Sequence, residues 1–267
     1  MIKIILSDID GTFLKDDKIP AALHAKAIKA VIDKGLKFVF VSARMPEAIY
    51  PITDALSMAH TPVISYGGGF VLTEDEKIIF DKKISAEDAK NILAAMNHWK
   101  DITINYYAGR KWYVEAIDWR AQREADITSA RFEVANFNKL LNENILPNKI
   151  MVICEPPTCA EMERELAKNF STLNVVRSAP YLLEVMDKNV SKATGIEILL
   201  KHYGFTVDEA IAFGDNYNDV EMLRYIPQSV AMANAPDAVK KLAAAVTDSN
   251  EVGGIYTYLV KVGIINQ

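Results

Sequence analysis

Two aspartates, Asp8 and Asp10, directly follow a short apolar segment near the start of the chain. Residues 2–6 are apolar except for Lys3, a pattern typical of a buried β-strand. Side chains two positions apart in extended backbone lie on the same side, so the two carboxylates would lie close together. Two unit charges about 4 Å apart repel by about 4 kcal/mol at an effective dielectric constant near 20. We therefore expect either a divalent cation between them or a proton on one of them.

Magnesium suits this pair of aspartates, because Mg²⁺ takes hard oxygen ligands and keeps positions open for a substrate phosphate. The next residue, Gly11, allows the sharp turn and the close approach of the backbone that such a site requires. The alternative is a surface turn after an edge strand, since Asp-x-Asp-Gly is by itself a weak motif. The position immediately after the first predicted strand favours a ligand site, because ligands of open α/β sheets bind at the carboxyl ends of strands.

Two residues farther along the chain could bind a substrate phosphate. Ser42 follows the apolar segment 36–41 and precedes a helix predicted to begin at Pro46, where a hydroxyl and free backbone amides can hold phosphate. Lys192 lies in the first turn of a helix predicted over residues 193–202. A cation there is unfavourable against the helix dipole, so we expect an anionic site to compensate it. If each residue is considered separately, the alternative for Ser42 is a helix cap, and the alternative for Lys192 is a solvated lysine.

Acidic and amide side chains recur after another apolar segment, residues 209–213. Asp215 could complete an oxygen site with Asp8, since the carboxyl ends of parallel strands meet at one edge of a sheet. Asn218 could donate a hydrogen bond to a phosphate. Asn and Asp also suit turns, so a helix cap rich in turn residues is the alternative here.

Together these residues would be suited to phosphoryl transfer. Asp8 would attack phosphorus and form an aspartyl phosphate. Asp10, when protonated, would give its proton to the leaving oxygen and then take one from water. Mg²⁺ between Asp8 and Asp215 would cancel the repulsion between carboxylates and phosphate. Lys192 and Ser42 would stabilise the charge that develops on the phosphoryl oxygens.

The elements that position these residues change in character along the chain. Up to about residue 83, apolar segments alternate with amphipathic ones, which predicts a parallel sheet with right-handed crossovers. From about residue 84, hairpins and helices follow the pattern of an α+β domain. The alternating pattern returns at about residue 188. We therefore expect an α/β core formed by residues 1–83 and 188–267, with an α+β domain inserted at residues 84–187.

Three local patterns carry further expectations. The triplet Gly67-Gly68-Gly69 lacks the Lys-Ser/Thr of a Walker motif, so we expect it to allow close backbone packing beside the site. A helix is predicted to begin at Thr158, which would form a capping box with Glu161. Four aromatic residues of the inserted domain are expected to be core rather than a substrate platform: Tyr106, Tyr107, Trp112 and Tyr113.

The composition is that of a globular chain of 267 residues with a net charge of −5, which argues against nucleic acid or an anionic membrane as the main partner. No segment approaches the ~18 uninterrupted apolar residues of a membrane span. The two cysteines, Cys154 and Cys159, are too few for a disulfide framework or a zinc site. A cytoplasmic location is the expectation.

Four motifs in order along the chain contain these residues. They resemble the motifs of the haloacid dehalogenase (HAD) superfamily, and within it those of the Cof-type sugar-phosphate phosphatases with a type IIB cap. The matching segments are Asp8-Ile9-Asp10-Gly11-Thr12-Phe13, Ser42-Ala43-Arg44, Val190-Ser191-Lys192 and Gly214-Asp215-Asn216-Tyr217-Asn218-Asp219. The resemblance implies a Rossmann-like core with a cap inserted between the second and third motifs.

The same resemblance implies which atoms hold Mg²⁺: the Asp8 side chain, the backbone carbonyl of Asp10 and Asp215, with Asp219 supporting the metal from outside. The implied function is hydrolysis of a small phosphorylated metabolite, sugar phosphates first. A phosphotransferase or mutase of the same chemistry is one alternative. A non-catalytic phospho-acceptor of the receiver type is another, although that class carries adjacent acids and needs only about 120 residues without a cap.

Overall fold

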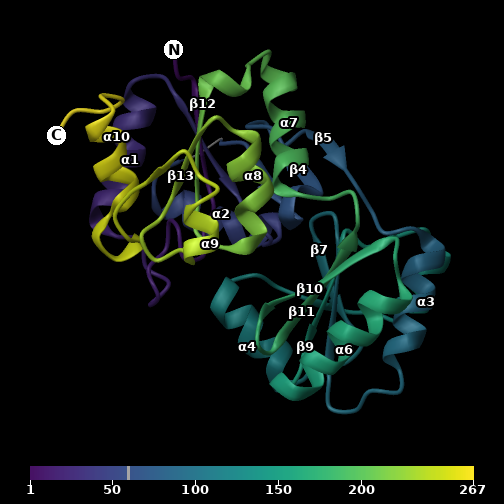
Figure 1. Cartoon of the computed structure of the whole chain (residues 1–267). Coiled ribbons are helices and arrows are strands. Elements are labelled where there is room, and N and C mark those ends of the chain that lie inside the picture. The colour runs from purple at the N-terminus through teal and green to yellow at the C-terminus, as the bar shows by residue number, and fades with distance from the viewer. Residues whose placement is uncertain (59–60) are drawn as a thin grey trace. The chain divides into compact units, whose positions relative to one another are not determined.

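The computed structural model describes residues 1–58 and 61–267. The chain forms two compact units, and Figure 1 follows it through both. The first unit contains both termini and consists of Met1–Arg44, Ile52–Phe80 and Ser191–Gln267. The second unit consists of Met45–Pro51 and Asp81–Val190.

The first unit is built on a sheet with the strand order β14-β13-β12-β1-β2-β3-β4-β5 in the described part of the chain. The pairings from β14 through β3 are parallel, as predicted, and β4 runs antiparallel to β3. The strands are β1 (Ile4–Ser7), β2 (Lys37–Val41), β3 (Val63–Ser65), β4 (Phe70–Leu72), β5 (Ile78–Asp81), β12 (Ala210–Gly214), β13 (Gln228–Ala231) and β14 (Ala245–Val246).

Helices cover both faces of this parallel sheet, which explains why its strands are continuous apolar segments. Helices α7 (Lys192–Tyr203) and α8 (Val220–Tyr225) share one core cluster with Ile4, Leu6 and Val39. On alternate strand positions Phe38 and Phe40 pack against Phe13. Helices α1 (Ala22–Asp33) and α10 (Gly254–Lys261) pack together and belong to this second side (Figure 1). Helix α9 (Asp237–Lys240) also belongs to the first unit, and α2 (Pro46–Ala55) contributes residues to both units.

Strand register brings distant polar residues to one edge of the sheet. Strand β1 lies between β12 and β2, with Ser7 opposite Phe213 on one side and Phe40 on the other. The backbone amide of Asp8 continues the ladder and donates to the carbonyl of Phe213 at 3.0 Å. The residues that follow β1, β2 and β12 therefore emerge side by side.

The glycine triplet allows close packing, as expected. Gly68 has a φ of +107°, and a Cβ there would lie 1.9 Å from the carbonyl oxygen of Ser191. Across the same contact, a Cβ on Gly195 would lie 2.8 Å from the Cα of Gly68. Because neither position accommodates a side chain, the backbone after β3 packs directly on the first turn of α7, which carries Lys192.

The second unit has a mostly antiparallel sheet with the order β10-β11-β9-β6-β7-β8. One apolar cluster joins its sheet to α3, α5 and α6, and the four predicted core aromatics are buried. Its strands are β6 (Thr103–Ala108), β7 (Lys111–Val114), β8 (Glu133–Val134), β9 (Lys149–Ile153), β10 (Leu173–Ala179) and β11 (Leu182–Asp187). Its helices are α3 (Ala86–Met96), α4 (Trp119–Thr128), α5 (Phe137–Asn142) and α6 (Pro156–Asn169).

The predicted start of α6 is wrong by two residues. The helix begins at Pro156, with Glu155 as its N-cap and no side-chain capping bond. Proline fits the first turn of a helix because the amide it lacks would have no partner there. The predicted capping box of Thr158 and Glu161 therefore does not form at the helix start.

Candidate active site

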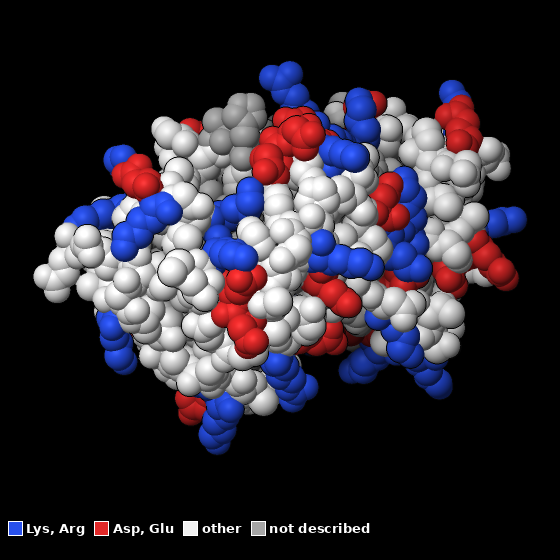
Figure 2. Space-filling view, turned by 90° about the horizontal axis from the view of Figure 1, so that it is seen from above, with Lys and Arg blue, Asp and Glu red and all other residues white. Residues whose placement is uncertain are grey.

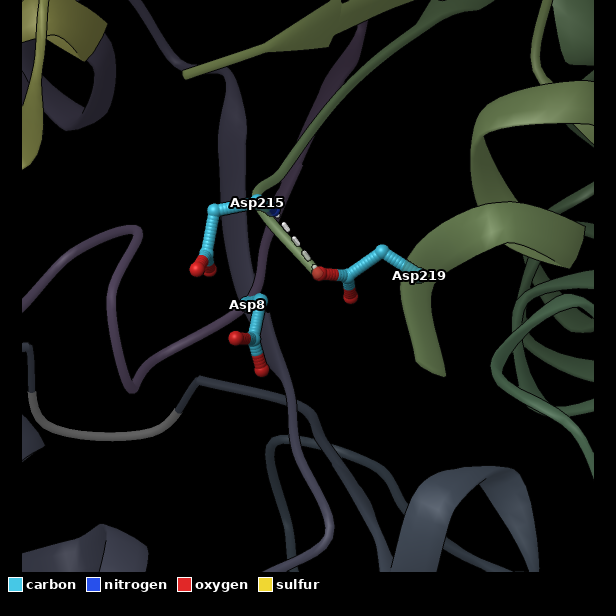
Figure 3. A group of neighbouring side chains, drawn as sticks. All are labelled: Asp8, Asp215 and Asp219. Atoms are coloured by element: carbon cyan, nitrogen blue, oxygen red, sulfur yellow. Dashed lines mark hydrogen bonds between the residues drawn. The ribbon is translucent and has the colours of Figure 1, made fainter. Parts of the chain in front are cut away.

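Three buried carboxylates meet beyond the ends of β1 and β12. Asp8, Asp215 and Asp219 each offer an oxygen atom, and these atoms all lie within 4.8 Å of one another. Figure 3 shows the three side chains converging from two segments of the chain. Asp8 and Asp215 are brought together as predicted, and Asp219 joins them in the cluster.

The turn after β12 fixes the orientation of Asp219. Its Oδ2 accepts hydrogen bonds from the backbone amides of Asp215 at 2.9 Å and Asn216 at 3.0 Å, the first drawn in Figure 3. Gly214 allows this approach, since a Cβ there would lie 2.6 Å from the Cβ of Asp219. Asp219 thus holds the turn that carries Asp215, besides adding its own charge to the cluster.

The turn after β1 is fitted just as closely to Asp215. Gly11 has a φ of +86°, and a Cβ there would lie 2.4 Å from Oδ2 of Asp215. Thr12 donates its hydroxyl to Oδ1 of the same carboxylate at 2.6 Å. A glycine at position 11 is therefore required by space as well as by backbone conformation.

Lys192 supplies the positive charge of the cluster. Its Nζ donates to Oδ1 of Asp8 at 2.5 Å and to Oδ1 of Asp219 at 2.6 Å. The side chain is buried at the start of α7, where Ser191 caps the helix by accepting from the amide of Thr194. The compensation expected for a cation in a first helical turn is thus provided by two carboxylates. Burial alone would lower the pKa of Lys192, but the charges of Asp219 and Asp8 raise it.

Asp8 and Asp215 hold protons more tightly than ordinary acids. Burial raises the pKa of Asp8 well above its usual value, against the opposing charge of Lys192. Burial likewise raises the pKa of Asp215 to about 6, although the hydrogen bond from Thr12 lowers it in part. The neighbouring charge of Asp219 adds to both increases. Carboxylate oxygens in this like-charged arrangement are a donor set that fits a hard divalent cation such as Mg²⁺.

The side chain of Asp10 points to other partners. Arg44 donates to both of its oxygens, from Nε to Oδ2 and from Nη2 to Oδ1, each at 2.8 Å. Lys18 donates to Oδ1 at 2.9 Å. Burial alone would raise the pKa of Asp10, but these two cations lower it to about 2. The carboxylate of Asp10 therefore lies in a cationic environment, unlike that of Asp8.

The two remaining predicted phosphate ligands differ in their surroundings. Ser42 is buried at the end of β2, beside β1, and its hydroxyl oxygen accepts from the amide of Arg44 at 3.2 Å. Asn218 is exposed within the short 3₁₀ turn Tyr217–Asp219. Among the interactions described for residues 1–58 and 61–267, none joins Asn218 to the three carboxylates.

Sequence reasoning assigned no role to Arg44, Lys18 or Thr12. Arg44 and Thr12 lie inside motifs, two residues after Ser42 and Asp10 respectively, so their positions were a usable signal. Lys18 lies in the polar loop after the first motif, where a lysine is ordinarily solvated. Asp219 was expected outside the metal site, and in the structure one of its oxygens lies within 4.8 Å of oxygens of both Asp8 and Asp215.

A family model for haloacid dehalogenase-like hydrolases matches residues 5–259. The chain belongs to the haloacid dehalogenase superfamily. Over 257 residues it is 30% identical to a Haemophilus influenzae protein named "Putative phosphatase", with 96% of each chain covered. The crystal structure of TM0651 from Thermotoga maritima superposes with a TM-score of 0.87 at 26% identity, covering 98% of this chain and 97% of that one.

A further relative carries a substrate in its name. The 5-amino-6-(5-phospho-D-ribitylamino)uracil phosphatase YcsE of Bacillus subtilis is 26% identical over 259 residues, covering 95% of this chain and 93% of its own. The resemblance to Cof-type phosphatases is confirmed, as is the α/β fold with a parallel core sheet and an α+β cap. This member of the HAD superfamily is a phosphatase.

Proposed function

We propose that this HAD phosphatase hydrolyses phosphate monoesters of small metabolites, with Mg²⁺ as cofactor and an aspartyl phosphate on Asp8 as intermediate. The observation that carries the proposal is the burial of Asp8 against Lys192 and two further carboxylates at the carboxyl edge of a parallel sheet. An acid in that position is withdrawn from solvent, and it lies where α/β proteins bind ligands.

Asp8 acts as the nucleophile in this scheme. Lys192 binds Oδ1 and so fixes the direction of Oδ2. A bond forms between Oδ2 and phosphorus while the bond from phosphorus to the ester oxygen breaks. Asp10, which must first leave its cationic partners and take up a proton, gives that proton to the ester oxygen. Water then attacks phosphorus, the bond from phosphorus to Oδ2 of Asp8 breaks, Asp10 takes a proton from the water, and inorganic phosphate leaves.

The carboxylates of Asp8 and Asp215 and the backbone carbonyl of Asp10 would hold the Mg²⁺ ion. When bound, Mg²⁺ cancels the repulsion between these acids and a phosphate dianion. Asp219 keeps Asp215 in place through the backbone of their shared turn. Lys192, the hydroxyl of Ser42 and the amide of Asn218 are the proposed donors to the phosphoryl oxygens.

The substrate class we propose is a sugar phosphate or a related polyol phosphate. Support comes from the Bacillus subtilis relative, whose named substrate carries a phosphorylated ribityl chain. On the face that Figure 2 shows, acidic and basic side chains are interspersed, which suits a small ligand better than a polyanion. In the described part of the chain, no helix combines the length and apolarity needed to cross a bilayer.

In this proposal residues 1–83 and 188–267 carry the chemistry, and residues 84–187 form the cap that selects the leaving group. Cys154 and Cys159 are buried free thiols, which suits a reducing compartment such as the cytoplasm.

The test is phosphate release from p-nitrophenyl phosphate and from a panel of sugar phosphates, with and without EDTA. Asp8→Asn should abolish release while the circular dichroism spectrum is unchanged. Asp33→Asn is the matched control, because Asp33 is an exposed acid that pairs with Lys29 on its own helix. Full activity of Asp8→Asn, or activity unaffected by EDTA, would overturn the proposal. Transfer of the phosphoryl group to an added sugar in place of release would reassign it as a phosphotransferase.

A further inference from the structure

The carboxylate of Asp10 is bound by two cations that the proposed chemistry does not use. The guanidinium of Arg44 forms a two-pronged pair with both carboxylate oxygens, and the ammonium of Lys18 adds a third bond. The planar fork of arginine matches a carboxylate and a phosphate in the same way. A phosphate could therefore replace the Asp10 carboxylate in this arrangement without any change in the geometry of Arg44.

Both cations are held in place by structure outside Asp10. Arg44 follows β2 two residues after Ser42, and 14% of its side chain is exposed. Lys18 adopts a φ of 65°, a left-handed conformation uncommon for lysine, at the tip of the loop after the first motif. Glu251 accepts from the amide of Asp16, and Asp17 accepts from Ile19, so the loop is tied on both sides of Lys18.

The cations around Asp10 are more accessible to an incoming phosphate than Lys192 is. Lys192 is already shared by Asp8 and Asp219 and is fully withdrawn from solvent. Asp10 is the more exposed partner of Arg44, with 38% of its side chain accessible. A phosphate dianion that enters from solvent therefore meets the cationic groups around Asp10 before it reaches the buried lysine.

We propose that Arg44 and Lys18 form a binding site for the phosphoryl group of the substrate, which the Asp10 carboxylate occupies in the free enzyme. The incoming phosphate takes the fork of Arg44 from Asp10. Asp10 is thereby released to turn toward the leaving oxygen, where the proposed function requires it. This inference rests on that function for the role of Asp10, but binding of phosphate by Arg44 and Lys18 can be measured without turnover.

The test is calorimetric titration with inorganic phosphate in the presence of Mg²⁺. The dissociation constant should rise about tenfold or more in Arg44→Gln, the loss of a charge-assisted bidentate contact, and several-fold in Lys18→Ala. Arg44→Lys should recover part of the loss, because it restores charge without the fork. Lys15→Ala is the matched control from the same loop, since Lys15 pairs with Asp17 and should bind phosphate like the wild type.

The Asp10→Asn variant tests whether phosphate displaces Asp10 from Arg44 or whether the Asp10–Arg44 ion pair is only structural. If Asp10 competes with phosphate for Arg44, Asp10→Asn should tighten phosphate binding in a protein that is otherwise wild type. In a protein that already carries Arg44→Gln, Asp10→Asn should leave phosphate binding unchanged. Weaker phosphate binding in Asp10→Asn, or unchanged binding in both Arg44→Gln and Lys18→Ala, would overturn the inference. If the protein binds phosphate through Arg44 but has no phosphatase activity, the proposed function is wrong and the inference about Arg44 still holds.

Discussion

Two groups of ion pairs lie at the same edge of the core sheet and differ in their exposure to solvent. The lysine cluster consists of Lys192, Asp8 and Asp219, whose side chains are 2%, 6% and 0% exposed. The arginine cluster consists of Arg44, Asp10 and Lys18, whose side chains are 14%, 38% and 52% exposed. Removing one partner of a buried pair costs about 3–5 kcal/mol, whereas an exposed pair contributes about 0–1 kcal/mol. In the proposed mechanism, this difference gives the nucleophile Asp8 a fixed position and the acid Asp10 exchangeable partners.

The largest expected effect comes from breaking the lysine cluster. Lys192→Ala leaves Asp8 and Asp219 buried without a counter-charge, so the free energy of unfolding should fall by about 3–5 kcal/mol. Because Lys192 is a proposed donor to the phosphoryl oxygens, its loss should lower kcat by about a thousandfold. Urea unfolding and p-nitrophenyl phosphate kinetics measure the two effects. Lys201→Ala, an exposed lysine of the same helix, is the control, and equal behaviour of the two variants would contradict the comparison.

A smaller effect is expected from crowding Asp215 without removing any charge. Gly11→Ala places a Cβ 2.4 Å from Oδ2 of Asp215, so that carboxylate must shift. Gly35→Ala imposes a similarly left-handed backbone, with nothing within 4 Å of the added Cβ. Both variants should lose about 1–2 kcal/mol of stability, but only Gly11→Ala should lose activity, by about a hundredfold. Comparable kcat values in the two would show that the fit of Gly11 to Asp215 is unimportant.

The dependence of stability on pH tests how strongly burial, together with the charge of Asp219, favours a proton on Asp215. Burial raises the pKa of Asp215 from 3.8 to about 6. Within this window the folded protein keeps a proton that the unfolded chain has released, so the stabilisation from this group is complete below 3.8 and is lost as pH rises to about 6. In metal-free protein, the free energy of unfolding should therefore fall more steeply with pH in the wild type than in Asp215→Asn. Urea unfolding across this pH range measures both slopes, and equal slopes would argue against a proton on Asp215.

The smallest effect is expected from Asn218, which belongs to neither cluster. Its neutral amide can donate one hydrogen bond to a bound phosphate, and because Asn218 is exposed to solvent that bond is worth about 1 kcal/mol, or about a fivefold change in kcat/KM. Asn218→Ala should show that decrease, and Asn169→Ala, at the end of α6, should not. A loss of a hundredfold or more would mean that Asn218 moves into the site when substrate binds.

Sequence predicted the parts of the fold that depend on continuous apolar segments. β1, β2 and β12 were recognisable because strands buried on both faces contain few polar residues, and their parallel order placed Asp8 and Asp215 at one edge. Helix α6 was predicted to start late because two prolines were interpreted as a break, although proline suits a first turn.

Other features of the site depend on side-chain pairings between distant segments. Whether Asp219 or Asn218 faces the carboxylates depends on the rotation of one 3₁₀ turn, which adjacent polar residues do not reveal. The bonds from Arg44 and Lys18 to Asp10 involve two connections of the chain, the one after β1, which carries Asp10 and Lys18, and the one after β2, which carries Arg44. No local pattern of apolar or polar residues indicates such pairings, and only the three-dimensional arrangement identifies them.

The position of β12 has a consequence for biosynthesis. Strand β12 pairs with β1, so β1 emerges from the ribosome long before the strand beside it has been translated. Lys192, which contacts Asp8, likewise lies 184 positions after Asp8. Until β12 has been translated, β1 presents an open, strongly apolar edge of the kind that promotes association between chains. The nascent protein should therefore be inactive and depend on chaperones until most of it has been translated. Truncation before residue 210 should yield insoluble polypeptide rather than a weakened enzyme.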